Sequence, residues 1–332
     1  MPPESVKLRA PLVGPRTSAW ASARVRVALA ASVILALTLA EWREMAHQWW
    51  DIDTYAHILL VPPIIAWLVW LRRDELAKIA PAGWVPGLGV LIAGLAVWLA
   101  GREGGINVVS QAGAIIALQG TVAALLGARA TLVLAFPLLY AFFLVPFGDE
   151  IIPVLQDVTA RIAVALTHAS GVPATVDGLF IDTPAGRFVI AEECAGVKFL
   201  IAMIAIGTLV AWNGFRSWKR RALLLVGAAL TSIIANGVRA WGTIYAAQYV
   251  GAERAGGIDH IIYGWVFFAV VIALVLAAAW RFFDRDPAEA GLTAYEAGAL
   301  AAQIGGRSIA ATHGLVAITA LAFVFAVIER LV

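Results

Sequence analysis

Long apolar runs, each close to the length of a membrane span, dominate the hydrophobic pattern of this chain. A helix needs about 20 mainly apolar residues to cross the hydrocarbon core of a bilayer. Nine stretches meet or approach this requirement, at residues 26–41, 56–71, 84–100, 106–126, 130–147, 195–213, 222–248, 261–283 and 308–328. We therefore predict an all-α polytopic membrane protein with eight or nine transmembrane helices.

Composition excludes the main soluble classes of protein. Of the 332 residues, 61% are hydrophobic and 14% are charged, whereas a typical soluble domain has about 25% charged residues. A soluble enzyme, a coiled coil and a disordered chain are all excluded, because the polar side chains are too few to cover a globule. The net charge of +2 does not suggest a nucleic-acid partner. The single cysteine excludes an internal disulfide.

The placement of lysine and arginine predicts the orientation, because cytoplasmic loops carry an excess of both. Basic residues cluster in the N-terminal tail and then in alternate loops, whereas acidic residues occupy the opposite loops. We expect a cytoplasmic tail at 1–25, the main transmembrane domain at 26–283, and a cytoplasmic linker with helical character at 284–307. An additional transmembrane helix should follow at 308–332.

One long loop on the outer side, residues 147–194, is expected to carry structure of its own. Its first half repeats apolar residues at helical spacing between Ile151 and Leu166, which predicts a short amphipathic helix on the outer leaflet. Its second half, from Ala174 to Ile190, alternates in polarity and contains Asp-Gly, Pro and Gly. That pattern predicts a unit like a β-hairpin before the cysteine.

Three side chains with chemical potential are expected at similar depth in the outer leaflet. Cys194 begins the sixth span and His260 begins the eighth, while Arg239 lies inside the seventh. Arg239 follows Arg221 by eighteen residues, or about 27 Å of helix, which brings it towards the outer interface. Each has a plain structural explanation as a small apolar filler, a snorkelling arginine or a solvated histidine. Their coincidence at one depth favours a site, since charges inside membranes usually face a cavity or a partner.

The chemistry of such a trio is coherent. A thiol attacks a carbonyl as its thiolate, which the positive end of a helix favours. His260 is suited to take the thiol proton and return it to a leaving amine. Arg239 offers fixed donors to a developing oxyanion. The product of the first step would be a thioester acyl-enzyme on Cys194.

Three stretches of the sequence resemble the cysteine, arginine and histidine motifs of the exosortase family. They are Glu193–Leu200 (ECAGVKFL), Asn236–Tyr245 (NGVRAWGTIY) and Asp259–Trp265 (DHIIYGW). The early stretches Tyr55-Ala56-His57 with Val61-Pro62-Pro63, and Phe136-Pro137 through Val145-Pro146, are also similar, so the resemblance covers about residues 40–285. The arginine and histidine motifs are most similar to those of exosortase A. Ala195 departs from the pattern, because the family commonly has serine after the cysteine.

The resemblance implies a cysteine-type membrane peptidase or transpeptidase, a thiol protease in broad terms, without a cofactor. Cys194 would be the nucleophile, and Arg239 and His260 would complete the site. The expected partners are exported proteins with a PEP-CTERM signal, which combines a C-terminal Pro-Glu-Pro motif, a transmembrane helix and a basic tail. An acceptor molecule of unknown identity would take the new carboxyl end. The family context is exopolysaccharide production in the bacterial inner membrane, with the active site on the periplasmic side.

Four further residues are candidate supporting groups, each with a structural alternative. Asn236 lies one turn before the arginine, where it is suited to bond the arginine or the substrate, or to join two helices. Lys198 lies one turn after the cysteine and either lowers the thiol pKa or extends outward. His57 is a candidate substrate gate or a residue among lipid headgroups. Glu193 either orients the histidine, binds a basic segment of the substrate, or belongs to a solvated loop.

Two other functional classes stay open. A glutamic intramembrane protease would use Glu192 and Glu193, although position 197 is valine and no His-x-x-x-Asn partner follows. A transporter or lipid-carrier protein would use Arg239 as an anion site, but paired broken helices and internal repeats are expected there and the sequence has neither. No H-E-x-x-H, CxxC, GxGxxG or Walker pattern is present, so neither a metal nor a nucleotide is predicted.

Overall fold

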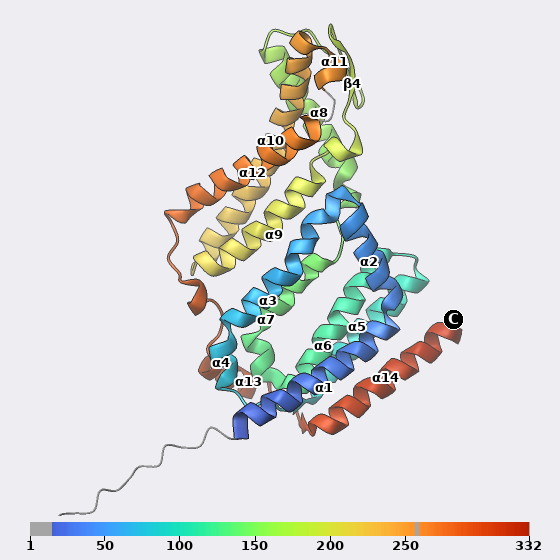
Figure 1. Ribbon diagram of the computed structural model, residues 1–332, viewed down its shortest axis with the longest axis vertical. Helices are drawn as coiled ribbons and strands as arrows, with labels where there is room; N and C mark the ends of the chain where they lie inside the picture. The colour runs from blue at the N-terminus through green and yellow to red at the C-terminus, as the bar shows by residue number, and fades with distance from the viewer. Residues whose placement is uncertain (1–14, 256–258, 332) are drawn as a thin grey trace, which may run out of the picture. The chain divides into compact units, whose positions relative to one another are not determined.

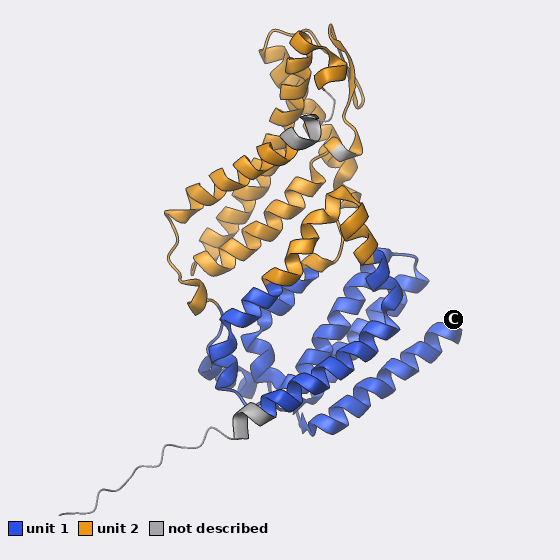
Figure 2. Ribbon diagram, in the orientation of Figure 1, with its two compact units in different colours: residues 1–44, 65–142, 291–332 blue, residues 45–64, 143–290 orange. Residues whose placement is uncertain are grey.

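The computed structural model describes residues 15–255 and 259–331, and within these ranges the side chains of 15–18, 193 and 259–263 are outside the description. The chain divides into two compact units, and Figure 2 shows them in different colours. Unit 1 contains residues 1–44, 65–142 and 291–332, and unit 2 contains residues 45–64 and 143–290. Helices make up most of both units (Figure 1). The predicted all-α polytopic architecture is confirmed.

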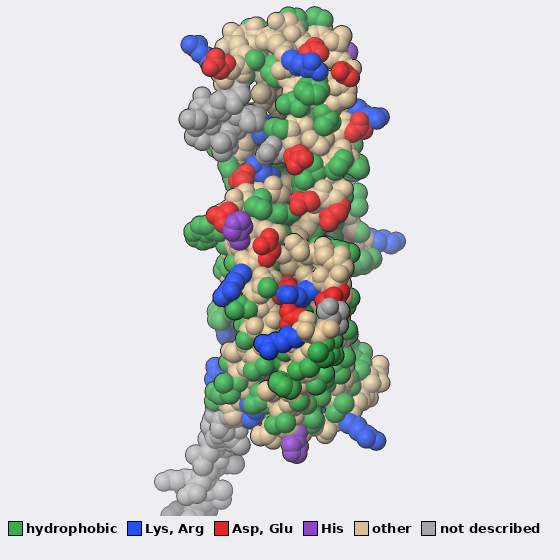
Figure 3. Space-filling model, turned by 90° about the vertical axis from the view of Figure 1, so that its right-hand side faces the viewer, with side chains coloured by type: hydrophobic (Ala, Val, Ile, Leu, Met, Phe, Trp, Pro, Cys, Tyr) green, Lys and Arg blue, Asp and Glu red, His purple; other side chains and the backbone are tan. Residues whose placement is uncertain are grey.

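Seven helices in the described ranges are long and apolar enough to cross a membrane. They are Ala19–Leu37, Asp53–Leu71, Val85–Glu103, Asn107–Val133, Val197–Gly214, Trp218–Val250 and Ala311–Leu331. The pair Ala135–Leu144 and Asp149–Ala169, bent by 63°, adds an eighth if it counts as one span, and Gly264–Trp280 is a shorter apolar helix. Many of their large apolar side chains are exposed, and the face drawn in Figure 3 carries wide apolar areas between scattered charges. Such a surface suits contact with hydrocarbon.

Unit 1 is built around four long helices. The α1, α5, α6 and α14 helices share a core that includes Ile34, Leu91, Trp98, Leu125 and Ile318. The elements of this unit, some of which continue into unit 2, are α1 (Pro15–Leu37), α2 (Leu39–Asp51), α3 (Val61–Leu71), α4 (Arg73–Ala77), β1 (Gly83–Trp84), α5 (Val85–Glu103), α6 (Asn107–Val133), α7 (Ala135–Tyr140), η2 (Ala141–Leu144), α13 (Ala294–Ile304), β5 (Ser308–Ile309) and α14 (Ala311–Leu331).

The α5 and α6 helices form a hairpin with unusually close backbones. Gly87, Gly94 and Gly101 recur every seven residues on α5 and face α6. A Cβ on any of them would lie 2.3–2.4 Å from a backbone nitrogen of α6. Gly113 and Gly120 of α6 face α5 in the same way. Small residues are typical where membrane helices pack, because apolar burial alone does not drive association in lipid.

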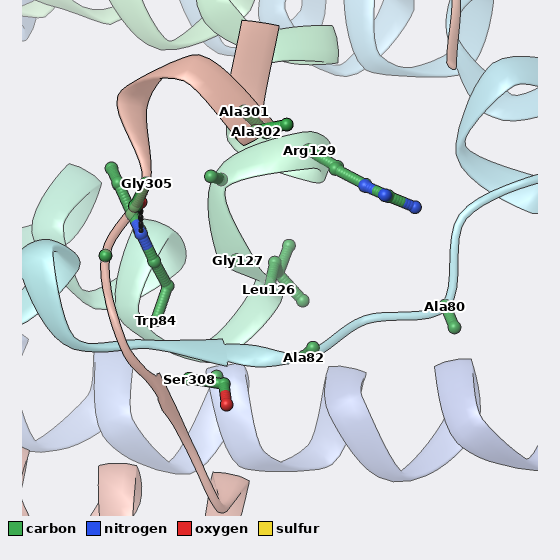
Figure 4. Close-up of a pocket in the computed structure, with 13 residues that line it drawn as sticks. Ala80, Ala82, Trp84, Leu126, Gly127, Arg129, Ala301, Ala302, Gly305 and Ser308 are labelled. Carbon is green, nitrogen blue, oxygen red and sulfur yellow. Dashed lines mark hydrogen bonds between the residues drawn. The ribbon is translucent and has the colours of Figure 1, made fainter. Parts of the chain in front are cut away.

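A bend at Gly127 divides α6 at the place where the sequence predicted a break between two spans. Gly127 has φ 86° and ψ 167°, inside an otherwise continuous helix. The Ala82 N–H donates to the Leu126 carbonyl oxygen next to the bend (3.3 Å). A cavity of about 410 Å³ lies here. Figure 4 shows the Trp84 indole at its edge, where Nε1 donates to the Gly305 carbonyl oxygen (3.0 Å).

The segment before the last helix is more ordered than a simple linker. Its predicted helical character is confirmed by α13, which begins with a capping box between Thr293 and Glu296. The short β5 strand then pairs with β1 in the register Gly83↔Ile309 and Trp84↔Ser308. This pairing ties the start of α14 to the start of α5. Sequence periodicity did not predict strands of two residues.

Two apolar clusters lie among the described residues of unit 2. One joins α9, α10 and α12 through Phe199, Met203, Ala228, Phe268 and Val271. The other joins α8, the small sheet and α10. The elements of this unit are η1 (Asp53–Leu60), η3 (Asp149–Ile151), α8 (Ile152–Ala169), β2 (Thr175–Asp177), β3 (Phe180–Thr183), β4 (Gly186–Val189), η4 (Glu192–Cys194), α9 (Val197–Gly214), α10 (Trp218–Val250), α11 (Ala252–Ala255), α12 (Asp259–Trp280) and η5 (Pro287–Glu289).

The predicted amphipathic helix and hairpin before the cysteine are both present. The α8 helix packs on α10, and Ala160 and Ala163 are buried in the second cluster. The alternating stretch forms an antiparallel sheet in the order β2-β3-β4, one strand more than a hairpin. Ile181 of the central strand is fully buried. This sheet leads the chain directly into the turn that carries Cys194.

Candidate active site

Cys194 lies in a tight turn immediately before α9. The turn closes when the Cys194 N–H donates to the Ala191 carbonyl oxygen (2.9 Å). The helix proper begins at Val197, and the Leu200 N–H donates to the Gly196 carbonyl oxygen (3.0 Å). Cys194 is partly exposed. Cys194 therefore lies just before the positive end of the α9 dipole.

Gly196 gives the turn its shape. Its φ of 84° lies in the left-handed region, which residues with a Cβ adopt at a cost. A Cβ there would also lie 2.5 Å from Cγ of Asn236. The sequence Cys-Ala-Gly-Val therefore folds into a turn that approaches α10 closely. Only glycine satisfies both the backbone angle and the approach.

Asn236 on α10 bonds directly to this turn. Its Nδ2 donates to the Cys194 carbonyl oxygen (2.8 Å) and to Oγ1 of Thr159 on α8 (3.0 Å). The side chain is almost fully buried, with 3% of its surface exposed. Gly237 allows the approach, because a Cβ on it would lie 2.4 Å from Ile162 of α8. Helices α8 and α10 and the cysteine turn therefore meet at one amide group.

Arg239 lies one turn after Asn236 and is also buried, at 5% exposure. Its guanidinium carbon lies 5.4 Å from the centre of the Phe199 ring on α9. Its Nη1 would lie 3.1 Å from a Cβ built on Gly264 of α12. Phe199 in turn stacks on Phe268 with ring centres 4.3 Å apart. The arginine is thus held between α9 and α12, over an aromatic face that attracts its charge.

His260 occupies the first turn of α12, which begins at Asp259. Gly264, against which the arginine packs, follows it by one helical turn. The histidine side chain lies outside the described residues, as does the Glu193 side chain. The structure therefore brings the backbone segments of the cysteine, arginine and histidine motifs together through α9, α10 and α12. The roles of the three side chains stay predictions.

The other supporting candidates lie on η1 or bond to it. Lys198 forms an ion pair with Asp53 through Nζ and Oδ2 and lies 5.3 Å from the Phe199 ring centre. His57 is half-buried, with Nδ1 3.1 Å from the Thr54 carbonyl oxygen. No hydrogen bond joins either side chain to Cys194 among the described contacts. Glu192 is exposed at the start of the cysteine turn.

A polar cavity of about 640 Å³ adjoins the cysteine turn within unit 2. The Tyr55 hydroxyl donates to Oδ1 of Asp149 in its wall (2.5 Å). Four carboxylates and one ammonium line it, from Asp51, Asp53, Asp149, Glu192 and Lys198. Val197, the first residue of α9, also contributes to the wall. The cavity provides polar space beside the turn that carries the thiol.

Several residues of this region were not singled out from the sequence. Thr159, Gly196, Phe199 and Gly264 all contact the cysteine turn, Asn236 or the arginine. Three of them stand inside the quoted motifs, so the signal for them was present in the sequence. Thr159 has no such signal beyond being a polar residue on the apolar side of an amphipathic helix.

Comparison with known proteins gives one family match. A family model described as transmembrane exosortase matches residues 49–277. The match covers more than half of the chain, so the protein belongs to the transmembrane exosortase family and is a multi-pass membrane protein. The match is to the family as a whole, and the A subtype stays a prediction. Neither the curated proteins nor the solved structures give a significant match.

Proposed function

We propose that this protein is a membrane-embedded cysteine peptidase or transpeptidase that cleaves the C-terminal PEP-CTERM signal of exported proteins. The main support is the direct bond between Asn236 and the turn of Cys194. One turn along the same helix, Arg239 packs on α12, which begins with the histidine motif. Membership of the exosortase family supports a substrate that is a sorted protein.

In the proposed reaction, His260 takes the thiol proton and the Cys194 thiolate attacks the scissile carbonyl carbon. Arg239 stabilises the oxyanion of the tetrahedral intermediate with its planar set of donors. The C–N bond then breaks, and the leaving amine takes the proton from His260. Water or an acceptor nucleophile then attacks the thioester and gives its proton to His260. The C–S bond breaks, and His260 passes that proton to the departing sulfur, which restores the Cys194 thiol.

We further propose that the site faces the periplasm of a bacterial inner membrane, with a cytoplasmic N-terminus. The charges of the loops support this orientation. The protein has one cysteine, so a membrane-impermeant maleimide reports on Cys194 alone. We expect labelling from outside in intact spheroplasts. Labelling only after the inner face is opened would reverse the orientation and separate the site from exported substrates.

The test of function is pulse-chase conversion of a tagged PEP-CTERM substrate. Cys194→Ala should insert normally and leave full-length substrate in the membrane. Arg239→Lys keeps the charge but loses the planar fork, and the loss of one oxyanion donor typically lowers the rate by about 10²–10³. Arg221→Lys is the matched control, because Arg221 lies on the same helix and also packs over an aromatic ring, that of Trp212 at 4.8 Å.

Two outcomes would contradict the proposal. Normal conversion by Cys194→Ala would exclude the cysteine mechanism, and loss of conversion on Glu193→Gln alone would then favour a glutamic protease. Wild-type conversion by Arg239→Lys would leave the arginine with an anchoring role only.

A further inference from the structure

We propose that Asn236, through Thr159, is the positioning residue of the cysteine turn, and that it holds the thiol in the geometry needed for attack. This inference rests on the proposed cysteine mechanism. Asn236 touches the backbone of the nucleophile at the Cys194 carbonyl oxygen rather than its thiol. It therefore acts on the reaction through the turn.

Both hydrogens of the Asn236 amide are committed. One goes to the Cys194 carbonyl oxygen, which can only accept, and the other goes to Thr159 Oγ1. This pattern fixes which end of the amide carries the nitrogen, since the reverse orientation would set two carbonyl oxygens against each other. Thr159 Oγ1 also lies 3.5 Å from the Ala195 carbonyl oxygen, as a donor. Side chains from α10 and α8 thus contact two consecutive carbonyls of the turn.

The remaining atom of the amide argues against a purely stabilising role. Oδ1 of Asn236 is buried and has no hydrogen-bond partner among the described residues. A buried polar atom without a partner costs about 1–3 kcal/mol, which offsets much of what two hydrogen bonds contribute. Joining α8 to α10 needs only the bond between Asn236 and Thr159, or an apolar pair with no unsatisfied atom. The second N–H of the amide donates to the Cys194 carbonyl oxygen, a bond that joining the two helices does not require.

The turn has little freedom once this bond is made. It is closed at one end by the Cys194–Ala191 hydrogen bond, and at the other end Gly196 leaves no room for a Cβ beside the Asn236 side chain. Displacement of a reacting group by about 1 Å can lower a rate by about 10²-fold. Release of the Cys194 carbonyl from Asn236 permits a displacement of this size. Side chains that lock a nucleophile in this way act as its supporting shell.

The test compares Asn236→Leu, Thr159→Val and the double variant in full-length protein in proteoliposomes, with a tagged PEP-CTERM substrate. We expect Asn236→Leu to lower kcat by about 10²-fold with KM unchanged. Thr159→Val should lower kcat less, because the bond to Cys194 remains. The double variant should be no slower than Asn236→Leu alone, since residues that act through one contact are not additive.

Asn213→Leu is the matched control. Asn213 is a buried asparagine of α9 whose Oδ1 also lacks a partner among the described residues, and its Nδ2 donates to Leu209 on its own helix. Asn213→Leu removes an unsatisfied amide from the same unit and should leave kcat unchanged. Wild-type kcat in Asn236→Leu, or losses in the two single variants that multiply in the double variant, would overturn the proposal.

Alkylation of the single thiol by N-ethylmaleimide separates this proposal from the proposed function. Asn236→Leu should speed alkylation of Cys194, because the turn opens more often, while Asn213→Leu should not. If Cys194→Ala still processes substrate, the cysteine mechanism fails, but faster alkylation would still show that Asn236 holds the turn. If Cys194→Ala is inactive and alkylation is unchanged in Asn236→Leu, the positioning role fails alone.

Discussion

Replacing Gly196 by alanine should disturb the cysteine turn through two separable effects. The φ of 84° is in the left-handed region, where alanine costs about 1–2 kcal/mol. The new Cβ would also lie 2.5 Å from Cγ and 2.7 Å from Nδ2 of Asn236, and relieving such an overlap in a packed region costs about 1–3 kcal/mol. We expect a total loss of about 2–5 kcal/mol in stability and a displaced Asn236 amide.

Two other glycines of unit 2 separate these effects. Gly171 has φ 77°, but a Cβ on it would meet nothing within 4 Å, so Gly171→Ala should show only the backbone cost of about 1–2 kcal/mol. Gly227 lies inside α10 in open space, and Gly227→Ala should stabilise the helix by about 1 kcal/mol. The difference in stability between Gly196→Ala and Gly171→Ala measures the cost of the overlap with Asn236.

The assay combines thermal unfolding in detergent with pulse-chase conversion of the tagged substrate. Gly196→Ala should be the least stable of the three variants and should convert substrate slowly, because the thiol no longer sits where Asn236 holds it. Gly171→Ala should lose stability but keep wild-type conversion. The reasoning would be refuted if Gly196→Ala matched Gly171→Ala in stability and converted substrate at the wild-type rate.

Two further predictions concern unit 1. Arg102 donates to buried Glu41 (3.1 Å) and pairs with Glu329 of α14 (2.9 Å), so Arg102→Met should lower stability by about 1–3 kcal/mol; an unchanged melting temperature would contradict this. Hydrogen bonds from Lys78 and from the backbone N–H that begins α13 hold the pKa of the Glu75 carboxyl below its ordinary value. The Glu75 carboxylate therefore contributes fully to stability above the ordinary carboxyl pKa, and this contribution is lost as pH falls through the lowered pKa. The melting temperatures of wild type and Glu75→Gln should accordingly differ at pH 7 and converge in acid. A difference that persists in acid would exclude Glu75 as the titrating group.

The parts of the fold that the sequence predicted are those with local causes. The spans follow from apolar runs, and the small sheet follows from alternation and an Asp-Gly turn. The two units were not predicted, because each combines segments that are far apart in the chain. The pairing of β1 with β5 has the same origin.

In the candidate site, too, features with a local cause were predicted and contacts between distant segments were not. Counting residues along helices predicted that Cys194 and Arg239 lie at similar depth, but not what each contacts. The bond between Asn236 and Thr159 joins residues 77 positions apart, and no local pattern encodes such a contact. The position of Lys198 one turn after Cys194 is visible in the sequence, whereas its ion pair with Asp53 depends on how η1 packs against α9.

The seven-residue spacing of Gly87, Gly94 and Gly101 helps to set the positions of β1 and α14 along the axes of α5 and α6. A slide of α5 by one turn, about 5.4 Å, would replace these glycines with larger residues at points where only about 2.3 Å separates a Cβ from the opposite backbone. The glycines therefore exclude a slide of one turn between α5 and α6. The observed register sets β1 level with the Gly127 bend, where Ala82 bonds to Leu126. Because β1 pairs with β5, the same stack of glycines also fixes the level at which the last helix of the chain begins.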